Sequence, residues 1–281
     1  MRLLTLKTIL VAVARDGTSD AGVRAGAALA AATGAVLHVV HVTDERDVTP
    51  ETLAQSMLRG VDARVHIVPG DAAYSIRSIA DRLKADVIVL GPHRGGTDPG
   101  RGSAFGTTAL GVVTNASAPC LVVSQALDLP LRHVLVPVDL SDTSRGALLV
   151  ALSWASALRP TEEDASTSLT ALYVGPNRES VAVGADRIRA LEQQVGEIRD
   201  VGGSWAGVDV RHSAVVGTDT AATIARYASE HGAGLVVLGT RGLGLDPIGR
   251  VGSVAGETIR LVHLPLLLVP PALWLTHARS P

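Results

Sequence analysis

The chain has 281 residues, enough for two domains of about 140 residues each. Hydrophobic residues make up 47% but aromatic residues only 2%, so a core must be built from Val, Leu, Ile and Ala, which suits parallel strands covered by helices. The net charge of −2 provides no global field to attract nucleic acid or an anionic membrane, and the single cysteine, Cys120, excludes an intramolecular disulfide framework and a Cys-based zinc finger.

The first residues lack the pattern of a secretory leader, and no apolar run reaches the length of about 18 residues that a membrane span needs. One buried-looking cysteine also fits a reducing compartment. We therefore expect a soluble cytoplasmic protein.

The second half of the chain repeats the first. The segment "TILVAV" (8–13) returns as "HVLVPV" (133–138), "GDAAYSIRSIADRLKADVIVLG" (70–91) returns as "TDTAATIARYASEHGAGLVVLG" (218–239), and "APCLVV" (118–123) returns as "LPLLLV" (264–269). Duplicated domains accumulate length differences in their loops, as these copies do. The repeat predicts two tandem domains, 1–128 and 129–281, joined within residues 124–132.

Strands and helices are predicted to alternate along the second copy. Apolar spacing indicates strands at 133–138, 169–174, 208–216, 234–239 and 265–270, and helices at 143–158, 185–200, 221–232 and 252–263. Such alternation is typical of a parallel sheet with helices on both faces. The predicted fold class is therefore α/β, with two doubly wound parallel-sheet domains in tandem.

A glycine-rich loop, "GTRGLGLDPIGRVGS" (239–253), follows the apolar strand "GLVVL". In doubly wound sheets, ligands bind beyond the carboxyl ends of the strands, and this loop lies at such an end. Its glycines and first helical serine follow the pattern G-2x-G-9x-G-S: Gly239, Gly242, Gly252 and Ser253. A helix that starts at Gly252 and Ser253 would direct free amides and the positive end of its dipole at an anion, with Ser253 capping the helix or donating to a phosphate.

Two common phosphate loops do not fit this segment. The lysines, Lys7 and Lys84, each follow a leucine, so the Gly-Lys-Ser/Thr of a Walker A loop is absent. A dinucleotide fingerprint starting at Gly242 would need its third glycine where Pro247 stands. P-loop chemistry is excluded, and a nicotinamide dehydrogenase is disfavoured.

The glycine spacing, joined to "VPVDLS" (136–141) and the order of the strands, resembles the universal stress protein family over the whole chain, as a tandem pair. The resemblance implies an adenine nucleotide α-hydrolase-like, Rossmann-like fold that binds ATP, with or without Mg²⁺. Residues matching the family's ATP contacts are Pro137, Val138, Asp139, Val174, Leu238, Gly239, Gly242, Gly252, Ser253 and Val254. The backbone of Val174 matches the group that contacts adenine.

Several side chains of the second copy have alternative interpretations. Asp139 is either an acceptor for sugar or adenine hydrogens or a helix N-cap. Gly239 and Gly242 remove side chains where ribose and phosphate approach the backbone, and Gly242 would tolerate a positive φ. Arg241 and Arg250 either add charge to the site or point to solvent.

The first copy departs from this pattern. Ala14 stands where Asp139 stands in the second copy, and Asp16 comes two residues late. Its glycine loop is two residues longer than the family spacing but keeps a Gly-Thr at the helix start. We expect the first domain to bind nucleotide weakly or not at all, with these candidate residues: Val42, Gly91, Gly96, Gly106 and Thr107.

Other polar clusters have simpler explanations than chemistry. His38 and His41 point to opposite faces of a strand and cannot share a metal ion. His93 is either a phosphate contact or an ordinary loop histidine, and Cys120 is interpreted as a packing residue. Glu257 and Asp246 flank the predicted phosphate site and either hold Mg²⁺, activate water or are structural.

The favoured function is an ATP-binding stress-response module whose bound nucleotide changes domain packing or partner affinity. A slow ATPase or nucleotide-dependent phosphotransferase is one alternative, and a structural family member without nucleotide is another. The segments "CLVV" (120–123) and "LLLV" (266–269) would be exposed sheet edges that must be covered. The family resemblance implies that the two copies pair there as an intramolecular pseudo-dimer, and a homodimer of whole chains is left open.

Overall fold

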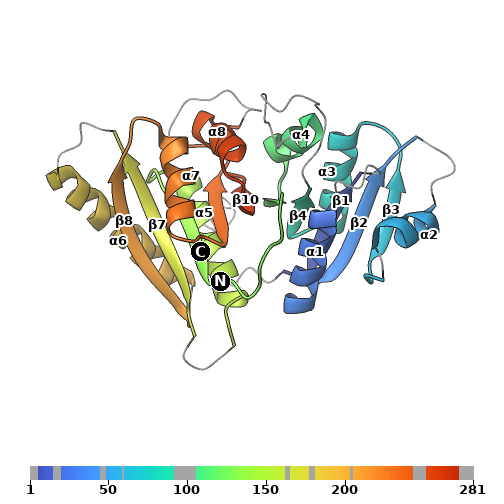
Figure 1. The fold of residues 1–281 in the computed structure, drawn as a ribbon, viewed down its shortest axis with the longest axis horizontal. Coiled ribbons are helices and arrows are strands. Elements are labelled where there is room, and N and C mark those ends of the chain that lie inside the picture. Colours follow the sequence, from blue (N-terminus) through green and yellow to red (C-terminus); the bar gives the residue numbers. More distant parts are fainter. Residues whose placement is uncertain are drawn as a thin grey trace. The chain divides into compact units, whose positions relative to one another are not determined.

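The computed structural model of the protein describes residues 6–14, 20–44, 49–58, 60–91, 106–161, 165–176, 181–202, 205–242 and 251–271. The chain forms two compact units, which divide between Leu127 and Asp128. Each unit is a parallel sheet covered by helices on both faces (Figure 1). The predicted doubly wound α/β class is therefore confirmed for both halves of the chain.

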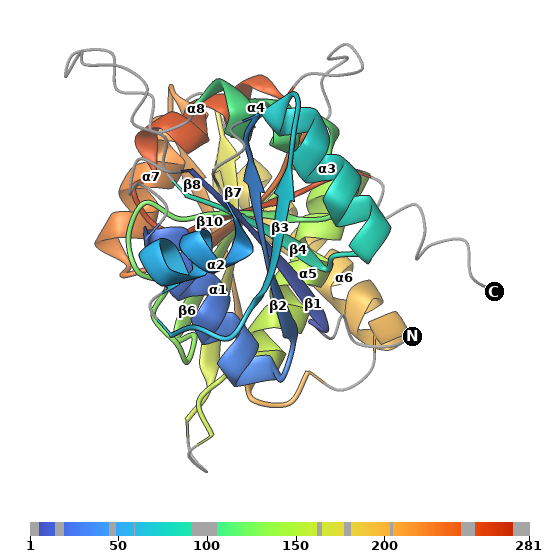
Figure 2. The same ribbon diagram turned by 90° about the vertical axis from the view of Figure 1, so that its right-hand side faces the viewer.

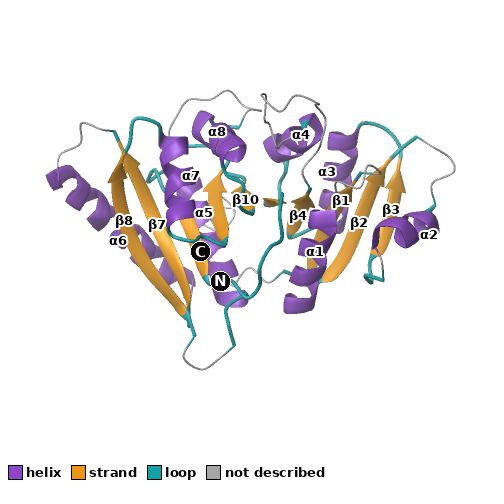
Figure 3. Cartoon of the chain, viewed as in Figure 1, coloured by secondary structure: helices purple, strands orange, loops and turns teal. Residues whose placement is uncertain are grey.

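The C-terminal unit alternates strand and helix. Its elements are β6 (His133–Pro137), α5 (Asp142–Ala157), β7 (Thr167–Gly175), α6 (Val181–Gly202), β8 (Val208–Val216), α7 (Thr220–Glu230), β9 (Leu235–Gly239), α8 (Ser253–Leu261) and β10 (Leu266–Val269). The sheet order is β10-β9-β6-β7-β8, and the paired strands run parallel. Figure 3 shows the parallel arrows of β7 and β8. Chain order therefore reverses between β6 and β9.

The helices of this unit divide between the two faces of the sheet. Helix α5 packs on β6, β7, β9 and β10 and contacts α6, whereas α7 and α8 pack against each other. Right-handed crossovers explain the division, because the chain steps one way along the sheet through α5 and α6 and the other way through α7 and α8. Helix α5 is buried almost throughout, which explains its nearly continuous apolar sequence.

The N-terminal unit has the same plan. Its elements are β1 (Thr8–Val13), α1 (Asp20–Thr33), β2 (Val36–Val42), α2 (Pro50–Leu53), a π-helical turn η1 (Ala54–Leu58), β3 (Arg64–Val68), α3 (Ala72–Leu83), β4 (Val87–Leu90), α4 (Thr107–Asn115) and β5 (Cys120–Val122). The sheet order is β3-β2-β1-β4-β5, also parallel. In Figure 2, α1 and α2 lie on one side of β2 and β3, and α3 lies on the other.

Close packing of small residues lets the helices approach the sheets. A Cβ added to Gly26 of α1 would lie 2.4 Å from Val11 Cγ2 of β1 and 3.2 Å from Leu37 Cδ1 of β2. Atoms cannot approach to 2.4 Å without moving, so glycine is required at this helix–sheet contact.

His133 joins three elements at the amino-terminal edge of the C-terminal sheet. Its Nδ1 lies 2.9 Å from the carbonyl oxygen of His231, and its Nε2 lies 3.0 Å from Thr170 Oγ1. A carbonyl only accepts, so Nδ1 carries the proton and the Thr170 hydroxyl donates to Nε2. Burial lowers the pKa of His133, with the hydrogen bond to His231 opposing that effect.

The predicted elements of the second copy match the structure closely. Strand β8 has the predicted bounds, while α6 extends beyond the predicted 185–200. Helix α7 ends at Glu230, and the chain turns at Gly232, which has a left-handed φ of 62°. In the described residues, no helix is both long and apolar enough to span a membrane.

Candidate functional site

A cavity of about 340 Å³ lies at the carboxyl ends of β6, β7 and β9 in the C-terminal unit. This is the point where chain order reverses, the usual ligand position in a doubly wound sheet. Its volume falls within the ordinary range for small-molecule sites. The lining residues are Pro137, Val138, Asp139, Ser144, Leu172, Tyr173, Val174, Thr220, Ile224, Leu238, Gly239, Arg241, Gly242, Ser253, Val254 and Ala255.

Three helices contribute their first turns to this cavity, and their N-termini differ. The Ser141 side chain caps α5, accepting from the amide of Ser144 at 3.2 Å. Asp219 caps α7, accepting from the amide of Ala222 at 3.0 Å. Helix α8 begins after Gly252, which makes no side-chain cap. Of these three N-termini, only that of α8 has no side-chain cap, so its positive end is available to an anion from outside the chain.

The first turn of α8 lines the cavity. Gly252 donates its amide to the carbonyl of Thr240 at 2.8 Å, and Gly256 donates to the carbonyl of Gly252 at 2.8 Å, closing the first turn. Helix geometry leaves the amides between these two bonds without partners inside the helix. They belong to Ser253, Val254 and Ala255, and all three residues line the cavity.

Ser253 does not cap α8, which was one of the two roles that the sequence suggested for it. Gly252 occupies the N-cap position, so Ser253 is the first helical residue. Without a side chain at the N-cap, the amides beyond it stay accessible.

Asp139 and Gly242 are in close contact on the lining of the cavity. Asp139 Oδ1 accepts from the amide of Ser141 at 3.0 Å, with Leu140 between them at a left-handed φ of 67°. A Cβ on Gly242 would lie 2.4 Å from Asp139 Oδ2. Ser141 is the N-cap of α5, so the N-cap interpretation of Asp139 is wrong.

Gly242 is needed for space rather than for its backbone freedom. Its φ does not lie in the left-handed region, so the tolerance of glycine for a positive φ is not used here. Gly239 is constrained in the same way, since an added Cβ would lie 2.8 Å from Thr143 Cγ2 and 3.2 Å from the Thr143 carbonyl oxygen. Both glycines therefore allow the β6–α5 segment and the glycine loop to pack closely.

The end of β7 extends past the end of β6. Val138 donates its amide to the carbonyl of Leu172 at 2.8 Å. Backbone groups alternate in direction along a strand, so the amide and carbonyl of Val174 point to the same side of β7 as those of Leu172. They lie beyond Pro137, where β6 ends, and can bond the edge of a flat ring. Apolar side chains of Val138, Leu172, Ile224 and Leu238 complete the lining here.

Nine of the ten residues predicted for the C-terminal site line this cavity, and the tenth, Gly252, is the N-cap of α8. Arg241 also lines it, whereas Arg250 lies outside the described residues. The sequence analysis missed six lining residues: Ser144, Leu172, Tyr173, Thr220, Ile224 and Ala255. Thr220 had a usable signal, because it directly follows the N-cap Asp219 at the carboxyl end of β8.

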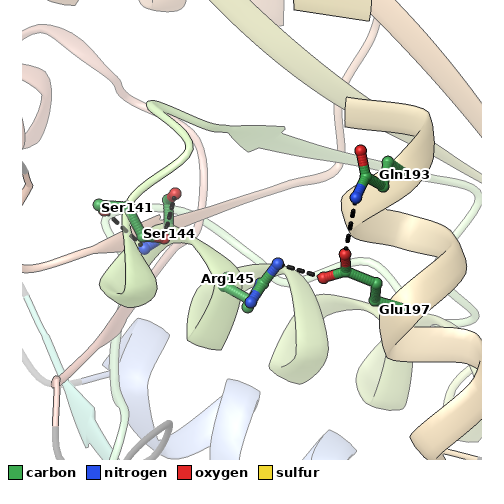
Figure 4. A network of polar contacts seen from close by, with 5 residues as sticks. All are labelled: Ser141, Ser144, Arg145, Gln193 and Glu197. Atoms are coloured by element: carbon green, nitrogen blue, oxygen red, sulfur yellow. Dashed lines mark hydrogen bonds and ion pairs between the residues drawn. The ribbon is translucent and has the colours of Figure 1, made fainter. Parts of the chain in front are cut away.

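A polar network connects the first turn of α5 to α6 (Figure 4). Arg145, which follows the cavity residue Ser144, forms an ion pair with Glu197 of α6. Gln193 donates from Nε2 to the other Glu197 carboxylate oxygen at 3.1 Å. The guanidinium of Arg187 on α6 lies 5.2 Å from the ring centroid of Tyr173. Helix α6 is thus tied to two elements that line the cavity.

The candidate residues of the N-terminal unit occupy matching places in their own sheet. Val42 ends β2, Gly91 follows β4, and Thr107 begins α4. Gly106 is the N-cap of α4 and, like Gly252 at the start of α8, makes no side-chain cap. Gly96, the remaining candidate, lies outside the described residues.

The two strand histidines of the N-terminal unit have separate partners. His38 Nδ1 lies 2.8 Å from His66 Nε2, with the rings stacked at 15°, whereas His41 Nδ1 donates to the carbonyl of Val13 at 2.9 Å. Burial lowers the pKa of both His38 and His66. No group of three or more metal-ligating side chains occurs among the described residues.

Other residues singled out in the sequence lie away from the cavity or outside the description. Glu257 forms an ion pair with Arg260 along α8, with 3.8 Å between Oε2 and Nη1. Cys120 is buried, which raises the pKa of its thiol to about 12. Such a thiol is unreactive and fits the packing interpretation. His93 and Asp246 lie outside the described residues.

Comparison with known proteins agrees with this architecture. The model of the universal stress protein family matches residues 5–59, 51–124 and 130–270. The chain belongs to the universal stress protein family. Both halves of the chain are therefore universal stress protein domains. A comparison with curated protein sequences found no match.

Two solved structures share the fold over nearly the whole chain. A protein of unknown function from Pseudomonas aeruginosa PAO1 is 17% identical, with a TM-score of 0.70 and coverage of 99% of both chains. A universal stress protein from Archaeoglobus fulgidus DSM 4304 is 16% identical, with a TM-score of 0.67 and coverage of 94% of this chain and 98% of that chain. At these identities, the likenesses show the fold alone.

A shorter solved protein matches one half of the chain. It is a universal stress protein from Archaeoglobus fulgidus in complex with dAMP, 22% identical, with a TM-score of 0.32. The match covers 42% of this chain and 98% of that chain.

Proposed function

We propose that the C-terminal unit binds ATP in its cavity and that the chain is a nucleotide-dependent regulatory module of the stress response. The observation that supports this most strongly is the cavity itself. Its described lining combines three amides of an α8 terminus without a side-chain cap, two closely packed glycines and one carboxylate. Uncapped amides suit phosphate, and a carboxylate suits the hydroxyl groups of a sugar.

Each part of the nucleotide has a matching part of the lining. The phosphates would be bound by the amides of Ser253, Val254 and Ala255. Asp139 would accept from the ribose, since its carboxylate lines the cavity and can accept several hydrogen bonds at once. The adenine edge would bond the backbone of Val174 between apolar side chains. Capping by Asp219 makes the α7 end unsuitable for phosphate, which sets the direction in which the nucleotide lies.

A regulatory role fits the charged groups of the cavity better than rapid hydrolysis. Asp139 is the only carboxylate in the described lining, and in this proposal it binds the sugar. Glu257 pairs with Arg260 instead of lining the cavity. A Mg²⁺ ion bound with ATP would be held chiefly by phosphate oxygens and water.

The N-terminal unit and the sheet edges have supporting roles in this proposal. Ala14 offers no carboxylate where Asp139 does, so the N-terminal unit would bind nucleotide weakly or not at all. Strands β5 and β10 are edge strands of their own sheets, and we propose that they cover each other in an intramolecular pseudo-dimer. The proposal places the chain in the cytoplasm and leaves open a homodimer of whole chains.

Two substitutions on the same helix test the nucleotide site. Gly252→Glu places a carboxylate beside the cavity amides, and we expect ATP binding measured by calorimetry to be lost while thermal unfolding of the nucleotide-free chain changes little. Gly256→Glu is the matched control, because an added Cβ there meets no atom within 4 Å. It should keep most of the affinity. If the wild-type chain binds no ATP, or if both variants bind as well as the wild type, the proposal is wrong.

A further inference from the structure

Among the described residues that line the cavity, Arg241 is the one cation, and the proposed function does not explain its role. It lies in the described part of the glycine loop, between Gly239 and Gly242, and lines the cavity with the first turn of α8. Among the residues that the structure describes, no carboxylate forms an ion pair with it. The carboxylate of Asp139, on the same lining, is directed to the Ser141 amide and to Gly242.

Other arginines of this unit are arranged differently. Arg145 pairs with Glu197, Arg211 with Asp209, Arg226 with Glu230, and Arg260 with Glu257. Arg241 follows Thr240, whose carbonyl accepts from the amide of Gly252, and no described carboxylate pairs with it, so together with the uncapped helix amides it makes this end of the cavity strongly attractive to anions. A guanidinium presents a fork of donors that matches phosphate oxygens in pairs.

The backbone amides of α8 and the side chain of Arg241 would bind different phosphates of the nucleotide. The three amides point from a single helical turn, so they surround one phosphate group. A nucleotide with one phosphate can satisfy them without Arg241. Further phosphates add charge next to this turn, and Arg241 is the cationic side chain in the described lining that can neutralise it.

We propose that Arg241 makes the site discriminate among adenine nucleotides by their number of phosphates, so that ATP binds more tightly than AMP. This inference rests on the proposed function and adds the residue that sets its specificity. The site would then respond to the ratio of ATP to AMP rather than to total adenine nucleotide.

Calorimetric affinities of AMP, ADP and ATP test this inference on the full chain. We expect Arg241→Gln to weaken ATP binding roughly tenfold, the low end for a charge-assisted hydrogen bond, and to change AMP binding less than about twofold. Arg241→Lys should recover part of the ATP affinity. The loss in Arg241→Gln should shrink at high salt, because screening weakens the same contact in the wild type.

Arg260→Gln is the matched control. It removes the same charge from α8, but Arg260 pairs with Glu257 and does not line the cavity. It should leave the ratio of ATP to AMP affinity unchanged. Thermal unfolding without nucleotide shows whether each variant is folded.

The outcomes separate this inference from the function on which it rests. Suppose that the wild type binds ATP but Arg241→Gln lowers the affinities for all three nucleotides equally, or lowers none of them. Discrimination by Arg241 among nucleotides is then wrong, while nucleotide binding stands. An equal effect of Arg260→Gln on the ratio of ATP to AMP affinity would also overturn this inference. The overall positive charge near α8, and not a contact with Arg241, would then set the ratio. A wild type that binds none of the nucleotides would overturn both.

Discussion

The contact between Gly242 and Asp139 makes a specific prediction for Gly242→Ala. The new Cβ would lie 2.4 Å from Asp139 Oδ2. Comfortable non-bonded contacts are about 3.5 Å, so the carboxylate or the loop must move by roughly 1 Å. A carboxylate displaced that far loses its bond to the sugar of a bound nucleotide, and a hydrogen bond to a charged group contributes about 1.5 to 3 kcal/mol. ATP affinity should therefore fall by about 10-fold or more.

A double-mutant cycle distinguishes this cause from a direct clash with phosphate. Asp139→Ala alone should weaken ATP by a similar factor, because it removes the same bond. In the double variant the carboxylate is gone, so the methyl group added by Gly242→Ala has room, and the loss should be no greater than for Asp139→Ala alone. Gly234→Ala is the control substitution, since its Cβ would make an ordinary 3.6 Å contact with the His133 carbonyl oxygen.

Additive losses in the cycle would refute this explanation. They would mean that the Gly242 position is needed for the ligand itself, as the sequence suggested, and not for Asp139. An unchanged affinity in Gly242→Ala would refute both explanations. The assay is calorimetry, with unfolding of the nucleotide-free variants measured in parallel to separate stability from binding.

Two further predictions concern stability. Gly26→Ala gains about 1 kcal/mol of helix propensity but places a Cβ 2.4 Å from Val11 Cγ2, and such overpacking costs about 1 to 3 kcal/mol. Denaturant unfolding should therefore show a lower free energy of unfolding for this variant. Gly196→Ala, where an added Cβ meets no atom within 4 Å, should instead raise the free energy of unfolding. The lowered pKa of His133 means that the unfolded chain binds its proton more readily. The stability that neutral His133 contributes is complete above its ordinary pKa of 6.5 and is lost as pH falls through the lowered value. His133→Gln replaces the imidazole that bonds the His231 carbonyl by a side chain that does not titrate. The free energy of unfolding of this variant should therefore fall less steeply with decreasing pH. Equal stability of both glycine variants, or an unchanged acid slope, would contradict the respective prediction.

The fold was predictable because its signals are local and repeated. Apolar runs such as 235–239 are buried strands, and polar residues mark where helices begin, as Asp219 does before α7. The duplication provided a second copy of each signal. The ends of α6 were not predicted, since a helix end depends on tertiary contacts that override weak propensities.

The glycine loop was predictable for a different reason than the rest of the site. Its spacing and its position after a buried strand are visible in the sequence, and so is the absence of a capping side chain at Gly252. The contact of Asp139 with Gly242 is not visible, because it joins segments far apart in the chain. The apolar wall at Ile224 was missed because its periodicity is the same as that of a core residue.

A crystal structure of the full chain with ATP is the decisive test of nucleotide binding by the C-terminal unit. We predict phosphate density against the amides of Ser253, Val254 and Ala255, with adenine beside the backbone of Val174. An empty cavity at saturating ATP would contradict this prediction, as would a nucleotide whose phosphates lie at the start of α7.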